Sequence, residues 1–436
     1  MNNKAIGCSE YQELSRRQFL STSAKVGGVL ALAPAWLPKV VLAQDDDSVS
    51  DIMVSIYLRG GADGLTLCVP YADADYYLKR PSLNIAAPNL GDPNSAKDLN
   101  GFFGLPPAMA PLLTAYQAGQ LLVVHATGSI DGSRSHFDAQ KYMEVGKPAD
   151  PTVGTGWLGR HLLTAAPVDP NAVLRATGVG NYGLSKTLVG GPKTLPIPDL
   201  DNYDLTGSSS TKAARTAWLN TAYNRAQEPL KSNALNTQAT INLLNTISFA
   251  GYTPAGGAVY PTGSFGYAIK SSAALIAANI GVEAIHIDVQ SWDTHNNQGI
   301  LVGTMATLMD SLARGLAAFH ADIFTRGINV TVAVMSEFGR VVAQNGSAGT
   351  DHGHGNCMFF IGQNIIGGRV LSKASMGGPD GWPGLSTAQL YQNQDLKVTI
   401  DHRDLLAEIV SKRLNNGANL PTIFPGYTPT FQGIAN

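Results

Sequence analysis

Short apolar runs rich in β-branched residues alternate along the chain with longer stretches whose apolar residues recur at helical spacing. Short runs of this kind are typical of strands that are buried on both faces of a sheet. Their alternation with helices favours an α/β domain built on a doubly wound, largely parallel sheet. The predicted strands are residues 52–58, 121–125, 284–289, 330–335 and 358–361.

Helices are predicted between and after these strands. Residues 299–324 carry apolar side chains about one helical turn apart. Ser264 is a candidate N-cap for a helix that begins shortly after it, and residues 137–145 are also predicted to be helical. Asp401 is a candidate cap for a final helix over residues 405–414.

Residues 171–263 have a different texture, because clusters of Gly, Pro, Ser and Asn surround a polar helical stretch at 211–247. We interpret this segment as a cap or insertion, which either shapes access for a substrate or is only a solvated excursion. Residues 367–394 are rich in Gly and Pro, and irregular structure is expected there. One domain is therefore expected over residues 44–436.

The N-terminal segment has the features of an export signal. Arg16 and Arg17 precede a weakly apolar stretch, residues 26–41, which Gly, Pro and Lys interrupt, and Ala43 ends a small-residue cleavage motif. A membrane-spanning helix needs about 20 apolar residues without such breaks, so no stable transmembrane anchor is expected. Residues 1–43 are predicted to be a twin-arginine signal, which implies the twin-arginine translocation machinery as a partner and a periplasmic location.

Composition narrows the function classes further. The formal net charge is -2 over 436 residues, and no basic stripe with interleaved aromatic residues is present, so nucleic acid is not an expected partner. Cleavage of the signal would remove Cys8 and leave Cys68 and Cys357. Two cysteines are too few for a disulfide scaffold, although one disulfide remains an option.

The candidate chemistry lies mainly in polar clusters that follow the predicted strands. Asp351, His352 and His354 lie in a glycine-rich run between two predicted strands, and carboxylate and imidazole groups are typical ligands for Zn²⁺ and similar ions. Open α/β sheets bind ligands at the carboxyl ends of their strands. This run is therefore a candidate part of a metal site.

Two further clusters supply candidate ligands. Asp63 follows the first predicted strand in a Gly-rich turn, and the alternative is that it only serves the turn. Asp293 and His295 follow the strand at 284–289, and residues two apart in an extended chain project to the same side. These two side chains could bind one ion, although Asp and His are also ordinary hydrogen-bonding residues of loops.

The segment after the strand at 121–125 carries Ser133, Arg134, Ser135 and His136 at the start of a predicted helix. A helix start binds anions, so either serine is a candidate nucleophile, with Arg134 holding an anionic group. The alternative is a structural capping box formed by Ser135 and Asp138.

Further residues are candidates for supporting or substrate-contacting roles. Glu337 and Arg340 follow the strand at 330–335, where they either support a metal site or form a salt-bridged loop. His136 and His402 are placed in the same class. For His402 the competing interpretation is that its neighbour Asp401 only caps the final helix.

The order of these clusters resembles the alkaline phosphatase superfamily, which includes sulfatase-like enzymes and phosphomutases. Within it, the chain is most similar to the exported family catalogued as domain of unknown function 1501. The resemblance covers nearly the whole mature chain and implies an alkaline phosphatase-like α/β fold. The segments that carry it are residues 60–65, 133–137, 292–295, 336–340 and 350–353.

The resemblance implies a two-metal site in which Asp63, Asp351 and His352 bind metal, with a Ser or Thr nucleophile after the second strand. Asp293 and His295 match the place of the superfamily's middle Asp/His pair, which has a longer spacing in alkaline phosphatases. The last histidine ligand is implied to be His354 or His402, residues that the sequence does not separate. Sulfatases that use formylglycine have a Pro two residues after the modified residue, and this chain has none in the matching segment.

The expected function is an exported, metal-dependent hydrolase of a phosphate or sulfate ester. Such an enzyme would use one or two divalent ions, with Zn, Mg, Mn and Ca not distinguished, and a serine or a metal-activated water as nucleophile. The alternative is a non-catalytic exported envelope or surface binding protein that retains the fold and a structural metal. A phosphomutase fits the fold but not export, because phosphorylated sugars are mainly intracellular.

Overall fold

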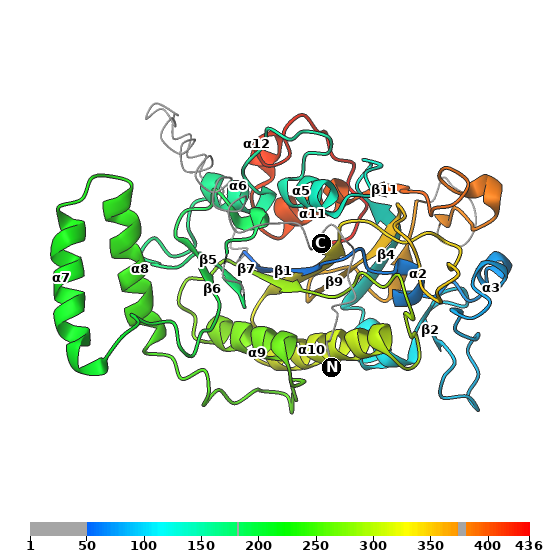
Figure 1. The fold of residues 1–436 in the computed structure, drawn as a ribbon, viewed down its shortest axis with the longest axis horizontal. Coiled ribbons are helices and arrows are strands. Elements are labelled where there is room, and N and C mark those ends of the chain that lie inside the picture. Colours follow the sequence, from blue (N-terminus) through cyan, green and yellow to red (C-terminus); the bar gives the residue numbers. More distant parts are fainter. Residues whose placement is uncertain (1–49, 181–182, 374–380) are drawn as a thin grey trace. The chain divides into compact units, whose positions relative to one another are not determined.

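A large, mostly parallel sheet organises the computed structural model of the chain, which describes residues 50–180, 183–373 and 381–436 (Figure 1). The predicted export signal, residues 1–43, lies outside the described residues. Along the sheet the strand order is β10-β4-β9-β8-β1-β7-β5-β6, and β11 pairs with β4. The strands are β1 (Ile52–Leu58), β4 (Leu121–Gly128), β5 (Ala176–Val179), β6 (Thr194–Ile197), β7 (Ala284–Val289), β8 (Val330–Ser336), β9 (Asn356–Gly362), β10 (Arg369–Leu371) and β11 (Ile400–Asp401).

Strand direction confirms the mixed α/β class and the mostly parallel sheet. β1 pairs in parallel with β7 and β8, and β5, β6, β10 and β11 also form parallel pairs. β9 is the exception, because it runs antiparallel to both β4 and β8. The start of β9 therefore lies at the edge where the neighbouring parallel strands end.

The five strands predicted from apolar runs correspond to β1, β4, β7, β8 and β9. Their alternate residues enter two separate cores, as period-2 side-chain geometry requires. In β1, Val54 and Ile56 join one core, whereas Met53 and Tyr57 join the other. Burial on both faces explains why these strands appear in the sequence as continuous apolar runs.

Helices cover both faces of the sheet (Figure 1). Helices α9 and α10 pack on one face together with α4 and η3, and helices α5, α6, α11 and α12 pack on the other. The bounds are η3 (Pro107–Leu112), α4 (Leu113–Gln117), α5 (His136–Val145), α6 (Trp157–Thr164), α9 (Ser264–Ala277), α10 (Thr304–Thr325), α11 (His402–Lys412) and α12 (Leu420–Ile423).

Two predicted helix starts are corrected by the structure. The helix predicted from residue 299 begins at Thr304, because Gly299 and Gly303 have φ angles of 65° and 130°, which a right-handed helix excludes. Ser264 is the first residue of α9 rather than its cap, and Gly263 occupies the cap position without a side-chain bond. The cap at Asp401 is confirmed, since its carboxylate accepts a hydrogen bond from the Arg403 amide.

Residues 171–263, interpreted from the sequence as a cap or insertion, contain two kinds of structure. β5 and β6 extend the main sheet beyond β7, and the helices α7 (Lys212–Asn224) and α8 (Leu230–Leu244) pack against each other. Among the described residues, no helix is long and apolar enough to cross a membrane.

The remaining elements are α2 (Gly64–Leu67), α3 (Ala74–Lys79), β2 (Lys97–Asp98), β3 (Gly104–Leu105), η4 (Lys186–Leu188), η5 (Ser209–Thr211), η8 (Thr387–Gln389) and η9 (Gly417–Asn419).

The sheet topology brings several chain segments to one edge. The loops that follow β1, β4, β7 and β8 begin there, and the loop that leads into β9 ends there. Cys68 and Cys357 are buried near this edge as free thiols. The predicted polar clusters therefore share the carboxyl edge of the sheet, where open α/β proteins bind ligands.

Candidate metal centre

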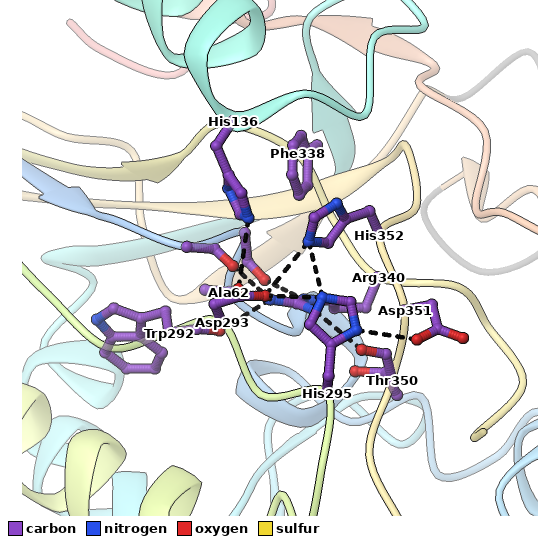
Figure 2. A network of polar contacts seen from close by, with 12 residues as sticks. Ala62, His136, Trp292, Asp293, His295, Phe338, Arg340, Thr350, Asp351 and His352 are labelled. Carbon is purple, nitrogen blue, oxygen red and sulfur yellow. Dashed lines mark hydrogen bonds and ion pairs between the residues drawn. The ribbon is translucent and has the colours of Figure 1, made fainter. Parts of the chain in front are cut away.

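Asp293 lies at the middle of a cluster of histidines (Figure 2). Its Oδ1 is 3.0 Å from His295 Nε2 and 3.3 Å from His352 Nε2. Its Oδ2 is 3.6 Å from His136 Nε2. Figure 2 shows the three imidazoles approaching this carboxylate from different segments of the chain. The loop after β7 thus supplies the carboxylate on which residues from distant parts of the sequence converge.

The second nitrogen of each of two imidazoles is held by an oxygen acceptor. His136 Nδ1 is 2.8 Å from Glu337 Oε1, and His352 Nδ1 is 2.9 Å from the Arg134 carbonyl oxygen. A carbonyl oxygen only accepts, so Nδ1 of His352 carries the proton. In the neutral tautomer the lone pair is then on Nε2, the nitrogen nearest Asp293, which is the form of imidazole that binds a metal ion.

Phe338 packs against both of these rings. Its ring centroid is 5.0 Å from that of His136 and 4.8 Å from that of His352. The aromatic ring and the two Nδ1 acceptors together restrict rotation of the imidazoles. Both side chains are therefore oriented before any ligand binds.

His295 approaches Asp293 from the more exposed side of the cluster. Its Nε2 is 2.9 Å from His352 Nε2, and its Nδ1 is 2.9 Å from Asp351 Oδ1. The exposed fraction of the side chain rises from 1% for His136 to 27% for His295 and 61% for Asp351. The cluster is thus closed behind His136 and open to solvent beside His295.

The geometry of this cluster fits a divalent cation. His136, Asp293 and His352 each place one ligand atom within 4.8 Å of the other two. Two imidazole nitrogens and a carboxylate oxygen form a donor set that Zn²⁺ and neighbouring transition metals accept, and three protein ligands leave a position for water or substrate. This partly buried His-Asp-His group could hold one metal ion.

Electrostatics around the cluster favour an ionised carboxylate. Burial raises the pKa of Asp293, but its contacts with three histidines and Arg340 lower the pKa by more than burial raises it. The pKa of Asp293 is therefore well below its usual range. Burial lowers the pKa of His136, whereas its contacts with Asp293 and Glu337 raise it to about 9. A proton and a cation therefore compete for His136, since a metal ligand must be neutral imidazole.

Arg340 holds three loops of the site together. Its guanidinium donates to Asp293 Oδ1 at 2.7 Å, to the Thr350 carbonyl at 2.9 Å and to the Gly61 carbonyl at 2.5 Å. It also donates to the Gly60 carbonyl. All of these partners are protein groups, and the side chain is fully buried. Arg340 therefore has a structural role, in which it holds the Asp293 carboxylate and the neighbouring loops in position.

Gly60 permits the close approach of the loop after β1 to Asp293. A Cβ atom at residue 60 would lie 2.4 Å from the Asp293 amide nitrogen, and the φ angle of 123° is one that other residues rarely adopt. We expect Gly60→Ala to lower the free energy of unfolding by at least about 2 kcal/mol, combining backbone strain with overpacking, and to weaken cation binding. Denaturant unfolding and cation titration measure the two effects.

Gly101→Ala is the matched control for this change. Gly101 has a φ angle of 81°, but a Cβ atom there meets nothing within 4 Å. This variant should show the cost of the backbone angle alone, roughly 1 kcal/mol, with unchanged cation affinity. Equal effects of the two substitutions on cation binding would contradict a specific role for the close approach at Gly60.

The structure does not bring Asp63 into this cluster. Both of its carboxylate oxygens accept from Arg80, and Thr66 and Gln298 donate to Oδ2 at 2.6 and 2.7 Å. Burial raises the pKa of Asp63, but the ion pair with Arg80 lowers it more. The carboxylate thus takes part in a saturated internal ion pair.

Ser133, Arg134 and Ser135 lie in the loop that leads to His136. The hydroxyl of Ser133 accepts from the Ser135 amide at 3.2 Å. Ser135 occupies the cap position of α5 without a side-chain hydrogen bond, so the capping box with Asp138 does not form. The Arg134 guanidinium bonds Asp395 and Gln392, while its carbonyl orients His352.

His354 and His402 have other surroundings. His354 packs on Tyr391 with a ring distance of 4.3 Å, and burial, followed by the charge of Arg134, lowers its pKa to about 4. His402 Nδ1 is 3.1 Å from the Gly128 carbonyl oxygen. Neither residue belongs to the group of converging ligand atoms.

Several residues in contact with the candidate site residues were not predicted from the sequence. Arg80, Gln298, Phe338 and Gln140 all contact a predicted site residue. Phe338 lies in the segment 336–340 that carries the resemblance, but its apolar ring was not a candidate for chemistry, and Arg80, Gln298 and Gln140 lie in none of those segments. Their partners lie as far as 235 residues away in the chain, so only the fold reveals these contacts.

Comparison with known proteins supports the family expected from the sequence. No curated protein matches the chain. A family model matches one segment of the chain, residues 268–416. This segment contains Asp293, Glu337, Arg340 and His352 but not His136. Residues 268–416 match the model of a family described as "Protein of unknown function (DUF1501)", and over this segment the match supports the family expected from the sequence.

Proposed function

We propose that this chain is an exported, metal-dependent hydrolase of phosphate or sulfate esters with an alkaline phosphatase-like fold. The observation that carries the proposal is the convergence of His136, Asp293 and His352 at the carboxyl edge of the sheet. The cluster combines ligand atoms, acceptors that orient the imidazoles, and one side open to solvent. These are features of catalytic rather than closed structural metal sites.

The three converging side chains would hold one divalent cation, and His295 is the next nearest donor. A cation there would supply Lewis-acid chemistry, polarising an ester oxygen and promoting deprotonation of water. Glu337 and the Arg134 carbonyl keep the two imidazoles in place during this chemistry. The exposed side, beside His295 and Asp351, is where an anionic ester would enter.

Two elements of the sequence-based mechanism change. Arg134 and Arg340 both make ion pairs within the protein, so charge neutralisation of the ester falls mainly to the cation. Of the two candidate serines, Ser135 is favoured because it adjoins His136 and its hydroxyl does not cap α5. Water is the competing nucleophile, and Ser135→Ala distinguishes the two because only a serine nucleophile would be lost.

A second candidate function rests on the same two arginines. Both guanidinium groups make ion pairs inside the protein, although the Arg134 side chain is 32% exposed, so no arginine among these site residues is free of an internal ion pair. That arrangement also suits a non-catalytic exported envelope or surface protein that retains a structural cation. Metal content and turnover, measured together, separate the two functions.

The decisive experiment uses the purified full chain with Zn²⁺, Mn²⁺, Mg²⁺ or Ca²⁺ and a panel of aryl and alkyl phosphate and sulfate esters. We expect about one bound ion per chain and turnover of at least one ester class. Chelation should lower turnover by about 100-fold or more, because the cation stabilises transition-state charge, and re-addition should restore it. A fully loaded chain that hydrolyses none of these esters would favour the non-catalytic function.

A further inference from the structure

We propose that Asp63 acts with Arg80 as a positioning pair for the metal centre, holding the segments around residues 340–342 and 350–352 in place rather than binding the cation itself. This inference rests on the proposed metal site. It assigns a role to an ion pair that the proposed chemistry does not use. The pair is fully buried, with side-chain exposures of 1% for Asp63 and 0% for Arg80.

The surroundings of Asp63 leave its carboxylate fully engaged. Oδ1 accepts from Arg80 Nη2 at 2.9 Å, and Oδ2 accepts from Arg80 Nη1, Thr66 and Gln298. A carboxylate with this many donors gains little from a cation, because binding would require several of these hydrogen bonds to break. The fixed positive charge of Arg80 also opposes a cation at the same oxygens.

The first connection to the metal centre runs through Gln298. Its amide nitrogen donates to Asp63, and its amide oxygen accepts from the Thr350 hydroxyl at 2.8 Å. Thr350 immediately precedes Asp351 and His352, and its carbonyl accepts from Arg340 at 2.9 Å. Asp63 thereby fixes the orientation of the Gln298 amide and, through it, the start of the ligand-bearing segment.

The second connection runs through Arg80. Its guanidinium donates to the carbonyl oxygens of Val342 at 2.8 Å and Val341 at 3.3 Å. The Val341 amide in turn donates to the Asp351 carbonyl at 2.9 Å, and Arg340 and His352 form an antiparallel bridge beside it. Arg80 therefore supports the backbone on which His352 is mounted.

Breaking the pair should loosen both connections. Loss of the Asp63 charge leaves Arg80 buried without its counterion, and both supported segments can then shift. A small displacement of His352 changes the geometry of the ligand set. Partners that orient metal ligands typically contribute about 10- to 100-fold to affinity, and we expect a loss in that range.

The test compares Asp63→Asn, the double variant Asp63→Asn with Arg80→Met, and Thr66→Val. The double variant removes both charges, which avoids an uncompensated buried arginine if the single variant folds poorly. Thr66 also donates to Asp63, and its hydroxyl accepts from Arg80 at 3.3 Å and from Gln298 at 3.4 Å, but within the described part of the chain no hydrogen bond joins its side chain directly to residues 340–352. Thr66→Val removes these neutral contacts and keeps the ion pair, so it is the matched control. The measurements are Zn²⁺ affinity by titration, bound ions per chain, the absorption spectrum of the Co²⁺-loaded protein and the thermal midpoint.

We expect the wild-type chain and all variants to bind the same number of ions. Both Asp63 variants should bind about 10- to 100-fold more weakly, with an altered Co²⁺ spectrum, whereas Thr66→Val should stay within about threefold of wild type. Unchanged affinity and spectrum in a folded Asp63 variant would reduce the pair to a structural role. Loss of one ion per chain would make Asp63 a ligand instead. Absence of cation binding by the wild-type chain would overturn the proposed function, and this inference with it.

Discussion

Replacing Asp293 with asparagine is expected to abolish specific cation binding at the centre. Asp293 is the carboxylate on which His136, His295 and His352 converge, and it also pairs with Arg340 at 2.7 Å. Asparagine removes the negative charge and replaces one oxygen with an amide nitrogen that cannot bind a cation. The affinity for Zn²⁺ should fall by at least about 100-fold, beyond the effect of residues that only orient ligands. Isothermal titration with metal analysis of the purified protein measures the change.

Asp288→Asn separates loss of the site from loss of folding. Asp288 lies five residues earlier in β7, is nearly buried, and pairs with Arg59 at 2.6 Å and His286 at 3.0 Å. Its loss should destabilise the fold by roughly 3 kcal/mol, as expected when one partner of a buried pair is removed, and leave cation affinity unchanged. Equal loss of binding in both variants would show that the Asp293 effect reflects folding instead of coordination.

The central strands were predictable because a strand that is buried on both faces has apolar residues at nearly every position, which appear in the sequence as a continuous run. β5 and β6 were not predicted, since ATGV and TLPI are short and contain Gly or Pro, which are signals of turns. The direction of β9 was not predicted either, because an apolar run does not show whether a strand is parallel or antiparallel to its neighbours. Its antiparallel course depends on the tertiary structure, and it brings His352 to the edge where the other strands end.

The site was predictable to the extent that its residues follow strand ends. Asp293, His295 and His352 were expected as ligands, and the structure brings them together. His136 was expected only as a supporting or substrate-contacting residue, yet its Nε2 belongs to the converging ligand atoms. The orientation of the His136 ring depends on Glu337, which lies 201 residues away in the chain. A local sequence pattern cannot predict a contact between residues so far apart. The ion pair of Asp63 with Arg80 was not predicted either, although the two residues are only 17 positions apart, because no local sequence pattern joins an aspartate of a turn to the arginine that ends α3.

Glu337→Gln is expected to weaken cation binding by about 10- to 100-fold while the chain remains folded. Glu337 Oε1 accepts from His136 Nδ1 and from the Gly60 amide, both at 2.8 Å, and the side chain is completely buried. Glutamine has the same shape and retains one oxygen acceptor, so the imidazole keeps a partner. It loses the negative charge that makes His136 a stronger electron donor to a cation. Zn²⁺ titration and the spectrum of the Co²⁺-loaded protein report this change.

Gln140→Ala is the matched control, because the Gln140 amide donates to the same Glu337 oxygen at 2.9 Å but carries no charge. Its removal leaves the charge of Glu337 and the contact between Glu337 and His136 intact, so cation affinity should change by less than about threefold, below the range expected for a partner that orients a ligand. If Gln140→Ala and Glu337→Gln weakened binding equally, packing around the carboxylate rather than its charge would govern the centre. A larger effect of Glu337→Gln alone would instead establish that the buried charge of Glu337, acting through His136, tunes the affinity for the cation.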